Sequence, residues 1–239
     1  MASPRFVAGA IPERFVEVDA ARLLLILMRF GEPIDADVRR LPCFPSYEVV
    51  RHFTPEYYLQ KLDFLLRYPG YLAYELTELH RLGVDTAPNR HEMMELVRSV
   101  LRDREPERLT VPFRKFWRGA YERLDDVEAW WYARQLVYTV LEPKGSARPQ
   151  KHYFLTALAE VEAQRLVAAV EQARWYAQRM DTIYRFFGGL SAARIKELQY
   201  SHEPYRQAQL NEIIPDLPPK EIVQNFARVF GEPLGVDLE

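Results

Sequence analysis

Apolar residues recur at three- and four-residue steps along most of this chain, which is the spacing of one face of an α-helix. Residues 19–30 begin the pattern, and the apolar run 23–28 leaves so little polar face that this helix should be deeply buried. Most of the other periodic segments have a capping residue before them or a Gly or Pro after them, and these residues mark the expected helix ends. Helices are predicted over residues 35–41, 55–68, 71–82, 90–101, 121–134, 191–200 and 220–230, and the longest over 157–187.

The expected helix ends rest on particular residues. Asp19 is expected to cap the first helix, and Gly31 to end it in a left-handed conformation. Thr54 before Pro55 predicts a capping hydroxyl followed by a proline in the first turn. Gly188 and the glycine after it indicate the end of the longest helix.

One segment departs from helical spacing. Residues 136–141 are rich in β-branched and aromatic residues, residues 142–150 hold Pro143, Gly145 and Pro149, and residues 152–155 form a second short apolar run. This order predicts a β-hairpin with a long tip. We predict a mainly α fold with this one hairpin, near residues 136–155, followed by a long helix and a helical C-terminal part.

Composition narrows the class of protein. The 239 residues are enough for one large domain or two small ones, and the formal charge of −2 means that any nucleic-acid contact must come from a local patch. The single cysteine, Cys43, excludes an internal disulfide and is typical of a reducing compartment. Residues 1–10 lack the apolar core of a signal peptide, and no apolar run approaches about 20 residues. A cytoplasmic location without membrane contact is the expectation.

The sequence contains no known catalytic motif. No histidine lies four residues from another, so the zinc-protease spacing is absent, and His91 with the acids after it offers too few metal ligands. The acidic group Asp125, Asp126 and Glu128 is interpreted as a solvated helix face. Cys43 is interpreted as a structural thiol. We therefore predict no catalytic residue, metal or cofactor.

Basic and aromatic residues are more informative. Arg114, Lys115 and Arg118 alternate with aromatic residues, and the expected hairpin tip, residues 143–153, has basic residues but no acid. Such a tip resembles the wing that a winged helix offers to phosphates; a solvated loop is the alternative. The predicted phosphate-binding residues are Arg114, Lys115, Arg118, Lys144, Arg148 and Lys151. The predicted anchors of a protein interface, with core positions as the alternative, are Trp117, Trp130 and Tyr132.

Residues 118–159 also resemble the second half of a winged helix: a helix, a strand, a basic tip, and a return strand that ends in Tyr153-Phe154-Leu155-Thr156 before the next helix. Ala159 stands where winged helices usually have glycine. Further segments, in order, read KLDFLLRYP (61–69), VPFRKF (111–116), FFGGLS (186–191) and LQY (198–200). Over residues 18–200 the chain thus resembles the middle component of ABC-three-component systems, which includes the small subunit of Lamassu-type antiphage defence.

We expect a winged-helix-like helical domain with the hairpin over residues 1–155 and a helical C-terminal region over 156–239, with one continuous domain as the alternative. Residues from 201 onward lie outside the resemblance. The resemblance implies a non-catalytic accessory subunit that bridges an SMC-like or ABC-type ATPase and an effector nuclease in an antiphage or anti-plasmid defence complex. The basic hairpin would then contact double-stranded DNA without sequence preference.

Two other functions fit the sequence. A winged-helix transcription regulator would bind an operator as a dimer, and Arg39 with Arg40 is its only candidate pair for a recognition helix. An all-helical enzyme would assemble its site from distant residues, with His80, His91, Glu75 and Glu95 as the candidates.

Overall fold

The computed structural model describes residues 15–83, 89–103, 112–116, 119–145 and 147–238, and within them the fold is mainly helical, with 11 helices, a four-stranded antiparallel sheet and a two-stranded hairpin. The helices are α1 (Val16–Phe30), α2 (Ala36–Arg39), α3 (Glu56–Arg67), α4 (Pro69–Arg81), α5 (Arg90–Arg102), α6 (Asp125–Ala133), α7 (Ala157–Ala169), α8 (Glu171–Phe187), α9 (Ala192–Ser201), α10 (Glu203–Gln207) and α11 (Pro219–Phe230). The strands are β1 (Glu32–Pro33), β2 (Arg51–Phe53), β3 (Arg114–Phe116), β4 (Gly119–Tyr121), β5 (Val137–Lys144) and β6 (Ala147–Leu155).

The predicted hairpin is present as β5 and β6, but it belongs to a larger sheet of order β1-β2-β6-β5. Its tip is shorter than predicted, because Glu142 pairs with Gln150 and the ladder continues to Lys144 opposite Ala147. Strands β1 and β2, which pair antiparallel beside β6, were not predicted, and neither was the separate pair β3–β4. The prediction of a single hairpin as the only β structure is therefore wrong.

Several predicted helix ends also need correction. The cap position of α1 is Phe15, and Asp19 lies in the helix, where its carboxylate contacts Arg22. Gly31 has φ −69°, so α1 does not end in a left-handed residue. Thr54 donates its hydroxyl to Lys151 O instead of capping α3. Asp35, Asn89, Thr156 and Ser191 do accept hydrogen bonds from backbone N–H groups of the helices that follow them.

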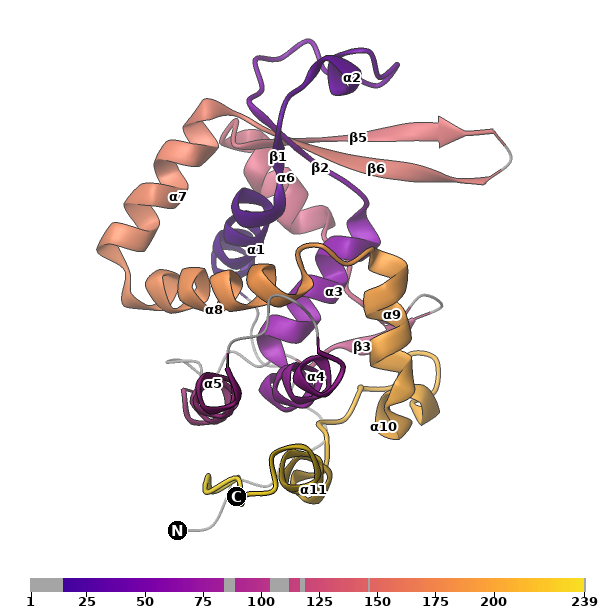
Figure 1. Cartoon of the computed structure of the whole chain (residues 1–239). Helices are drawn as coiled ribbons and strands as arrows, with labels where there is room; N and C mark the ends of the chain where they lie inside the picture. Colours follow the sequence, from indigo (N-terminus) through magenta and orange to yellow (C-terminus); the bar gives the residue numbers. More distant parts are fainter. Residues whose placement is uncertain (1–14, 84–88, 104–111, 117–118, 146, 239) are drawn as a thin grey trace.

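The predicted longest helix is two helices. Val170 has extended backbone angles, φ −118° and ψ 121°, and separates α7 from α8, so that the chain turns and α8 runs back across α1 (Figure 1). The two helices contact each other, and both contact α1. Helix α1 also packs on α6, the helix that precedes the hairpin. Helices α7 and α8 of the C-terminal region therefore pack on the same helix as α6 does.

One continuous apolar cluster runs from Ala20 in α1 to Leu234 after α11. Helices α4 and α5 pack together, and α11 lies against α4 on the side of the molecule away from the sheet (Figure 1). The side chains of residues 156–239 thus share a core with those of residues 15–155.

A charged network crosses this core beside α1 and α3. Arg22 contacts Asp63 through its Nε at 2.7 Å, and Arg67 contacts both Asp63 at 3.3 Å and Glu122 at 2.9 Å. Gln60 closes the network by bonding both backbone groups of Glu122. Burial alone would raise the pKa of Asp63, but the two guanidinium groups lower it below its ordinary value. The network fixes α1, α3 and the residue that follows β4 relative to one another.

Candidate functional site

The β5–β6 hairpin leaves the helical body. At its root, Val137 pairs with Leu155 and both are buried; at its far end Lys144 and Gly145 are exposed. Figure 1 shows the far half of the hairpin extending past the helices below it. Gly145 has φ +60°, a conformation that glycine adopts without steric cost, which suits the tight turn. The hairpin therefore presents its tip to solvent as a two-stranded arm.

The predicted basic residues of the hairpin have different surroundings. Lys144 is at the tip, with its side chain 44% exposed and its Nζ 2.6 Å from Glu142. The backbone of Arg148 is in β6, and its side chain lies outside the described part of the chain. Lys151 is near the root, where its ammonium contacts Glu128 at 2.7 Å and Glu56 at 3.2 Å. Lys151 is therefore removed from the phosphate-binding set, because two carboxylates of the chain itself hold it.

The predicted basic residues that precede the hairpin also differ in their surroundings. Arg114 on β3 is exposed and donates to Asn211 O at 2.8 Å. Lys115 is buried, and its ammonium donates to Tyr205 O and Arg206 O at 2.7 and 2.6 Å, which lie at the C-terminal end of α10. Burial lowers the pKa of Lys115. Lys115 stabilises the end of α10 and is also removed from the set, whereas Arg118 lies outside the described residues.

The predicted interface aromatics include one strongly exposed ring. Tyr132, at the end of α6, is 57% exposed and contacts Tyr138 edge-on, and its hydroxyl is 3.4 Å from that of Tyr47. Tyr47 stacks on Tyr138 with 3.9 Å between ring centroids. We call these three residues the tyrosine cluster. Tyr47 was not predicted, because nothing local in its loop connects it with the end of α6.

Trp130 is more enclosed than Tyr132. It is half-buried against the core, the guanidinium of Arg134 lies 3.8 Å from its ring centroid, and its buried Nε1 has no hydrogen-bond partner in the described structure. Trp117 lies outside the described residues. Of the three predicted anchors, Tyr132 is thus the one shown to present a ring to solvent.

A line of polar side chains crosses the face of the sheet opposite the core. His52 on β2 contacts His152 on β6, with 2.8 Å between Nε2 and Nδ1, and Nε2 of His152 is 3.1 Å from Glu142 on β5. Because a carboxylate only accepts, His152 donates from Nε2 to Glu142, whereas the proton between His52 Nε2 and His152 Nδ1 belongs to either ring according to their tautomers. Burial and the neighbouring imidazole lower the pKa of His52 to about 4, so its ring is neutral at pH 7.

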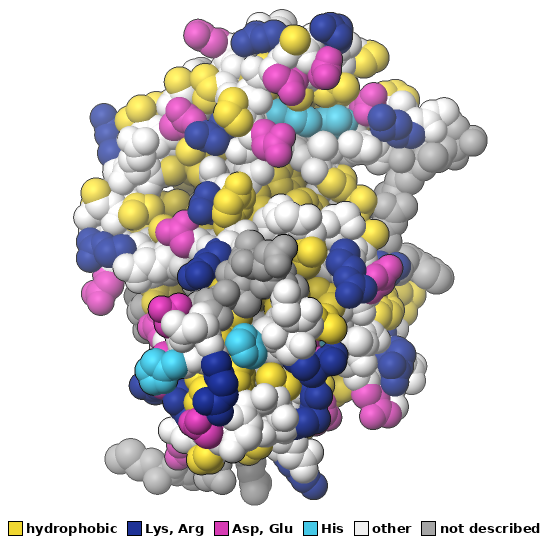
Figure 2. Space-filling model, viewed as in Figure 1, with side chains coloured by type: hydrophobic (Ala, Val, Ile, Leu, Met, Phe, Trp, Pro, Cys, Tyr) yellow, Lys and Arg dark blue, Asp and Glu magenta, His cyan; other side chains and the backbone are white. Residues whose placement is uncertain are grey.

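His52 is half-buried and His152 is almost fully buried, and their rings stack with 5.1 Å between centroids. Figure 2 shows histidine side chains on the face over the sheet. Elsewhere on that face, Lys and Arg side chains are interspersed with Asp and Glu. The contact between His52 and His152 was not predicted, because the two residues are 100 positions apart in the sequence and β2 was not predicted.

The residues considered for an enzyme do not form one site. Glu75 contacts buried His202 at 2.5 Å, and Glu95 contacts Arg98 and Arg102. His80 stacks on Phe230, and His91 is exposed. In the part of the chain that the structure describes, no group of three or more His, Cys, Asp or Glu side chains is placed to hold a metal ion.

The acidic group before the hairpin is only partly a solvated face. Asp125 and Asp126 are exposed, as predicted, but Glu128 is enclosed between Lys151 and the Tyr153 hydroxyl, which donates to it at 3.1 Å. Burial raises the pKa of Glu128 in spite of these two partners. Its role is to hold the root of the hairpin on α6.

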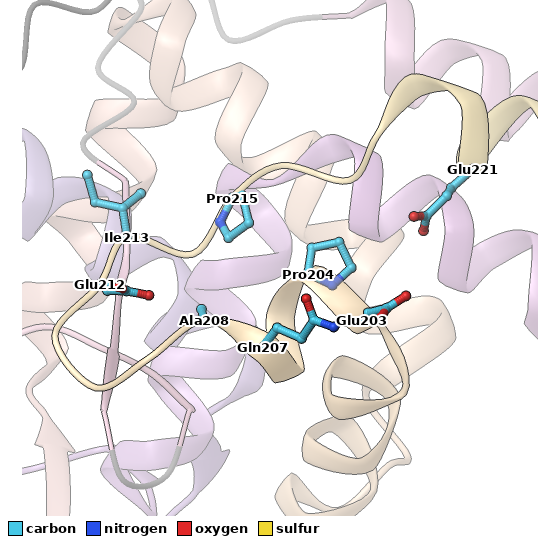
Figure 3. A pocket seen from close by; sticks show the side chains of 8 residues that line it. All are labelled: Glu203, Pro204, Gln207, Ala208, Glu212, Ile213, Pro215 and Glu221. Carbon is cyan, nitrogen blue, oxygen red and sulfur yellow. Dashed lines mark hydrogen bonds between the residues drawn. The ribbon is translucent and has the colours of Figure 1, made fainter.

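A concave region lies between α10, the loop after it and the start of α11 (Figure 3). It encloses about 450 Å³, and its lining includes Glu203, Glu212 and Glu221 but no Lys or Arg. Glu203 accepts from Gln207 at 2.6 Å, and Glu212 from the backbone N–H of Gln209 at 2.8 Å. This region is acidic and lies away from the hairpin.

Comparison with protein-family models, with curated proteins and with solved structures finds no match to this chain. Among the described residues, no helix has the length and apolar character that crossing a membrane requires.

Proposed function

We propose that this chain is a non-catalytic accessory subunit with a winged-helix-like core. It bridges an SMC-like or ABC-type ATPase and an effector nuclease in an antiphage or anti-plasmid defence complex. The hairpin tip contacts the phosphates of double-stranded DNA, and the tyrosine cluster contacts a protein partner.

The observation that carries the proposal is the order of the sheet. In a winged helix, a first strand pairs beside the return strand of a later hairpin, and a helix directly precedes that hairpin. Here β2 pairs with β6, β6 pairs with β5, and α6 ends four residues before β5. Helices α4 and α5 and the β3–β4 pair then stand as an insertion between α3 and α6.

The charge on α6 favours the accessory subunit over a sequence-specific regulator. In a DNA-reading winged helix, the helix before the hairpin enters the major groove, where basic and amide side chains read bases. The exposed positions of α6 include Asp125 and Asp126, which would repel phosphates. Arg39 and Arg40 lie at the end of α2, which has four residues and is therefore too short to serve as a recognition helix. DNA contact is therefore assigned to the hairpin tip.

The tyrosine cluster suits a protein partner. Tyrosines combine a large apolar area with few rotatable bonds, and such residues dominate the binding energy of protein interfaces. Tyr132 and Tyr47 are 57% and 46% exposed, yet their rings are held by Tyr138 and by each other. A partner that covers them loses little side-chain freedom at this position.

Co-expression with the products of the neighbouring genes tests the proposal. We expect a tagged full-length chain to co-purify with an SMC-like or ABC-type ATPase, and Tyr132→Ala to weaken that association by about 2 kcal/mol. Tyr57→Ala, at another exposed tyrosine, is the matched control. Lack of association with such an ATPase, together with binding of a dimer to one defined DNA sequence, would instead support the regulator.

A further inference from the structure

The hairpin carries an anion of its own beside the lysine that we assign to DNA. The Nζ of Lys144 lies 2.6 Å from Oε2 of Glu142, two residues earlier on β5. Residues 143–153 contain no acid, so the carboxylate that neutralises this ammonium comes from just before the tip. A phosphate that binds Lys144 must therefore replace this carboxylate or share the ammonium with it.

Glu142 is held more firmly than an ordinary surface carboxylate. Its side chain is 12% exposed, and the oxygen that contacts Lys144 is also 3.1 Å from Nε2 of His152 on β6. In the ladder His152 stands opposite Val140, two residues before Glu142, so the imidazole and the carboxylate share one face of the hairpin as diagonal neighbours. The carboxylate therefore has one partner at the tip and a second partner farther along the arm.

His152 is itself anchored in the sheet. It is almost fully buried, its Nδ1 is 2.8 Å from Nε2 of His52, and its ring stacks on the rings of His52 and Phe154. Lys144, by contrast, has a long flexible side chain at the exposed end of the arm. When the ion pair opens, the lysine therefore moves and the carboxylate stays in place.

The contact between Glu142 and Lys144 is strong enough to form and weak enough to be replaced. Hydrogen bonds from Lys144 and then from His152 lower the pKa of Glu142, which is therefore ionised at pH 7. A single ion pair at a solvated tip is nevertheless weak, because water and salt screen it. Lys151 at the root is enclosed by two carboxylates and is less exposed. A run of phosphates can thus take Lys144 from its partner, whereas Lys151 stays bound within the chain.

We propose that Glu142 is an internal competitor of phosphate that sets the affinity of the hairpin tip for double-stranded DNA. In the free chain the carboxylate cancels the charge of Lys144, and in the complex a phosphate takes its place while His152 keeps the carboxylate on the arm. A polyanion that makes several contacts at once offsets the cost of opening the pair, whereas a single anion does not. This inference rests on the proposed DNA contact and adds to it a residue of opposite charge.

Binding of a short double-stranded DNA of arbitrary sequence to the full-length chain, followed by fluorescence anisotropy at low salt, tests the competitor. Glu142→Gln keeps an oxygen that accepts from His152 but removes the charge that holds Lys144. We expect this variant to bind the DNA about fivefold more tightly. In a Lys144→Gln background the same substitution should change the affinity by less than about twofold, because the carboxylate then has no ammonium to occupy.

Glu162→Gln is the matched control, because it removes the same charge from an exposed pair with Arg165 on α7, and it should leave the affinity unchanged. Urea denaturation of each variant separates a loss of folding from a change in affinity. Unchanged affinity in Glu142→Gln, or a gain that persists in the Lys144→Gln background, overturns the competitor and leaves the DNA contact standing. If Lys144→Glu with Arg148→Glu binds DNA as the unaltered chain does, the DNA contact itself fails and the competitor fails with it.

Discussion

The helical body and the hairpin both carry acidic and basic side chains, but those of the body's central network are buried and those at the hairpin tip are exposed. In the body, Asp63 and its partner Arg22 each have side chains 2% exposed. At the hairpin tip, Lys144 has one carboxylate partner and is 44% exposed, and Lys151 at the root is intermediate at 17%. Removing a buried partner leaves an uncompensated charge in the core, whereas an exposed charge is solvated by water. Depth therefore separates charges that stabilise the fold from charges available to a ligand.

The largest expected effect is at the centre of the buried network. Asp63→Ala leaves Arg22 and Arg67 without their shared carboxylate, and we expect it to lower the free energy of unfolding by about 3–5 kcal/mol. Urea denaturation measures this loss. Asp37→Ala, which removes the exposed partner of Arg40, should cost less than about 0.5 kcal/mol. Equal losses in the two variants would show that burial does not separate them.

The next effect is at the hairpin root. Lys151→Ala leaves Glu56 and Glu128 facing each other in a half-buried site, and we expect a loss of about 2 kcal/mol. Lys144→Ala, on the same hairpin, should change stability by less than about 0.5 kcal/mol.

The loss at Lys151 should also depend on pH. Burial raises the pKa of Glu128 in the folded chain, and loss of Lys151 raises it further, so the cost is largest when this carboxyl is ionised. Urea denaturation of Lys151→Ala and Lys144→Ala at pH 8 and pH 4 should show that the difference between their free energies of unfolding is smaller at pH 4. A pH-independent difference would mean that Lys151 acts through packing instead of charge.

The contrast between Lys151 and Lys144 also marks what the sequence could predict. The hairpin was predictable, because residues 136–141 carry a local β signal. The partners of Lys151 were not, because Glu56 and Glu128 are 95 and 23 residues away. Likewise, β2 is three residues long and is defined by its pairing with β1 and β6, so Arg51, His52 and Phe53 show no strand pattern of their own.

Helix boundaries show the same limit. Capping side chains such as Asp35 and Asn89 act on the next few residues, and the helices after them begin within one residue of the predicted starts. The break at Val170 has neither Gly nor Pro, and it follows from the packing of α7 and α8 on α1. Local chemistry was thus visible in the sequence, whereas features made by distant contacts, including the tyrosine cluster and the histidine pair, were not.

A smaller effect is expected at the hairpin tip, where a substitution should change the affinity for DNA instead of the free energy of unfolding. In the assembled complex, Lys144→Glu with Arg148→Glu should weaken association with double-stranded DNA about tenfold at low salt and reduce the salt slope by about 2. Arg123→Glu with Arg165→Glu makes the same change of charge at exposed positions elsewhere and is the control. Unchanged binding in the hairpin variant would remove the DNA role and leave the bridging role standing.

The smallest expected effect concerns His52, which lies between the two extremes of depth. Its folded pKa of about 4 is below the ordinary value of 6.5, so the unfolded chain binds a proton there first as the pH falls. This residue should therefore cost the fold stability between pH 6.5 and pH 4, by about 1 kcal/mol, because its half-exposed ring is partly screened by solvent. Urea denaturation at several pH values should show that His52→Ala flattens the pH dependence over this window, whereas His91→Ala does not. An unchanged slope in His52→Ala would place this imidazole with the solvated charges of the hairpin tip instead of with the buried groups of the body.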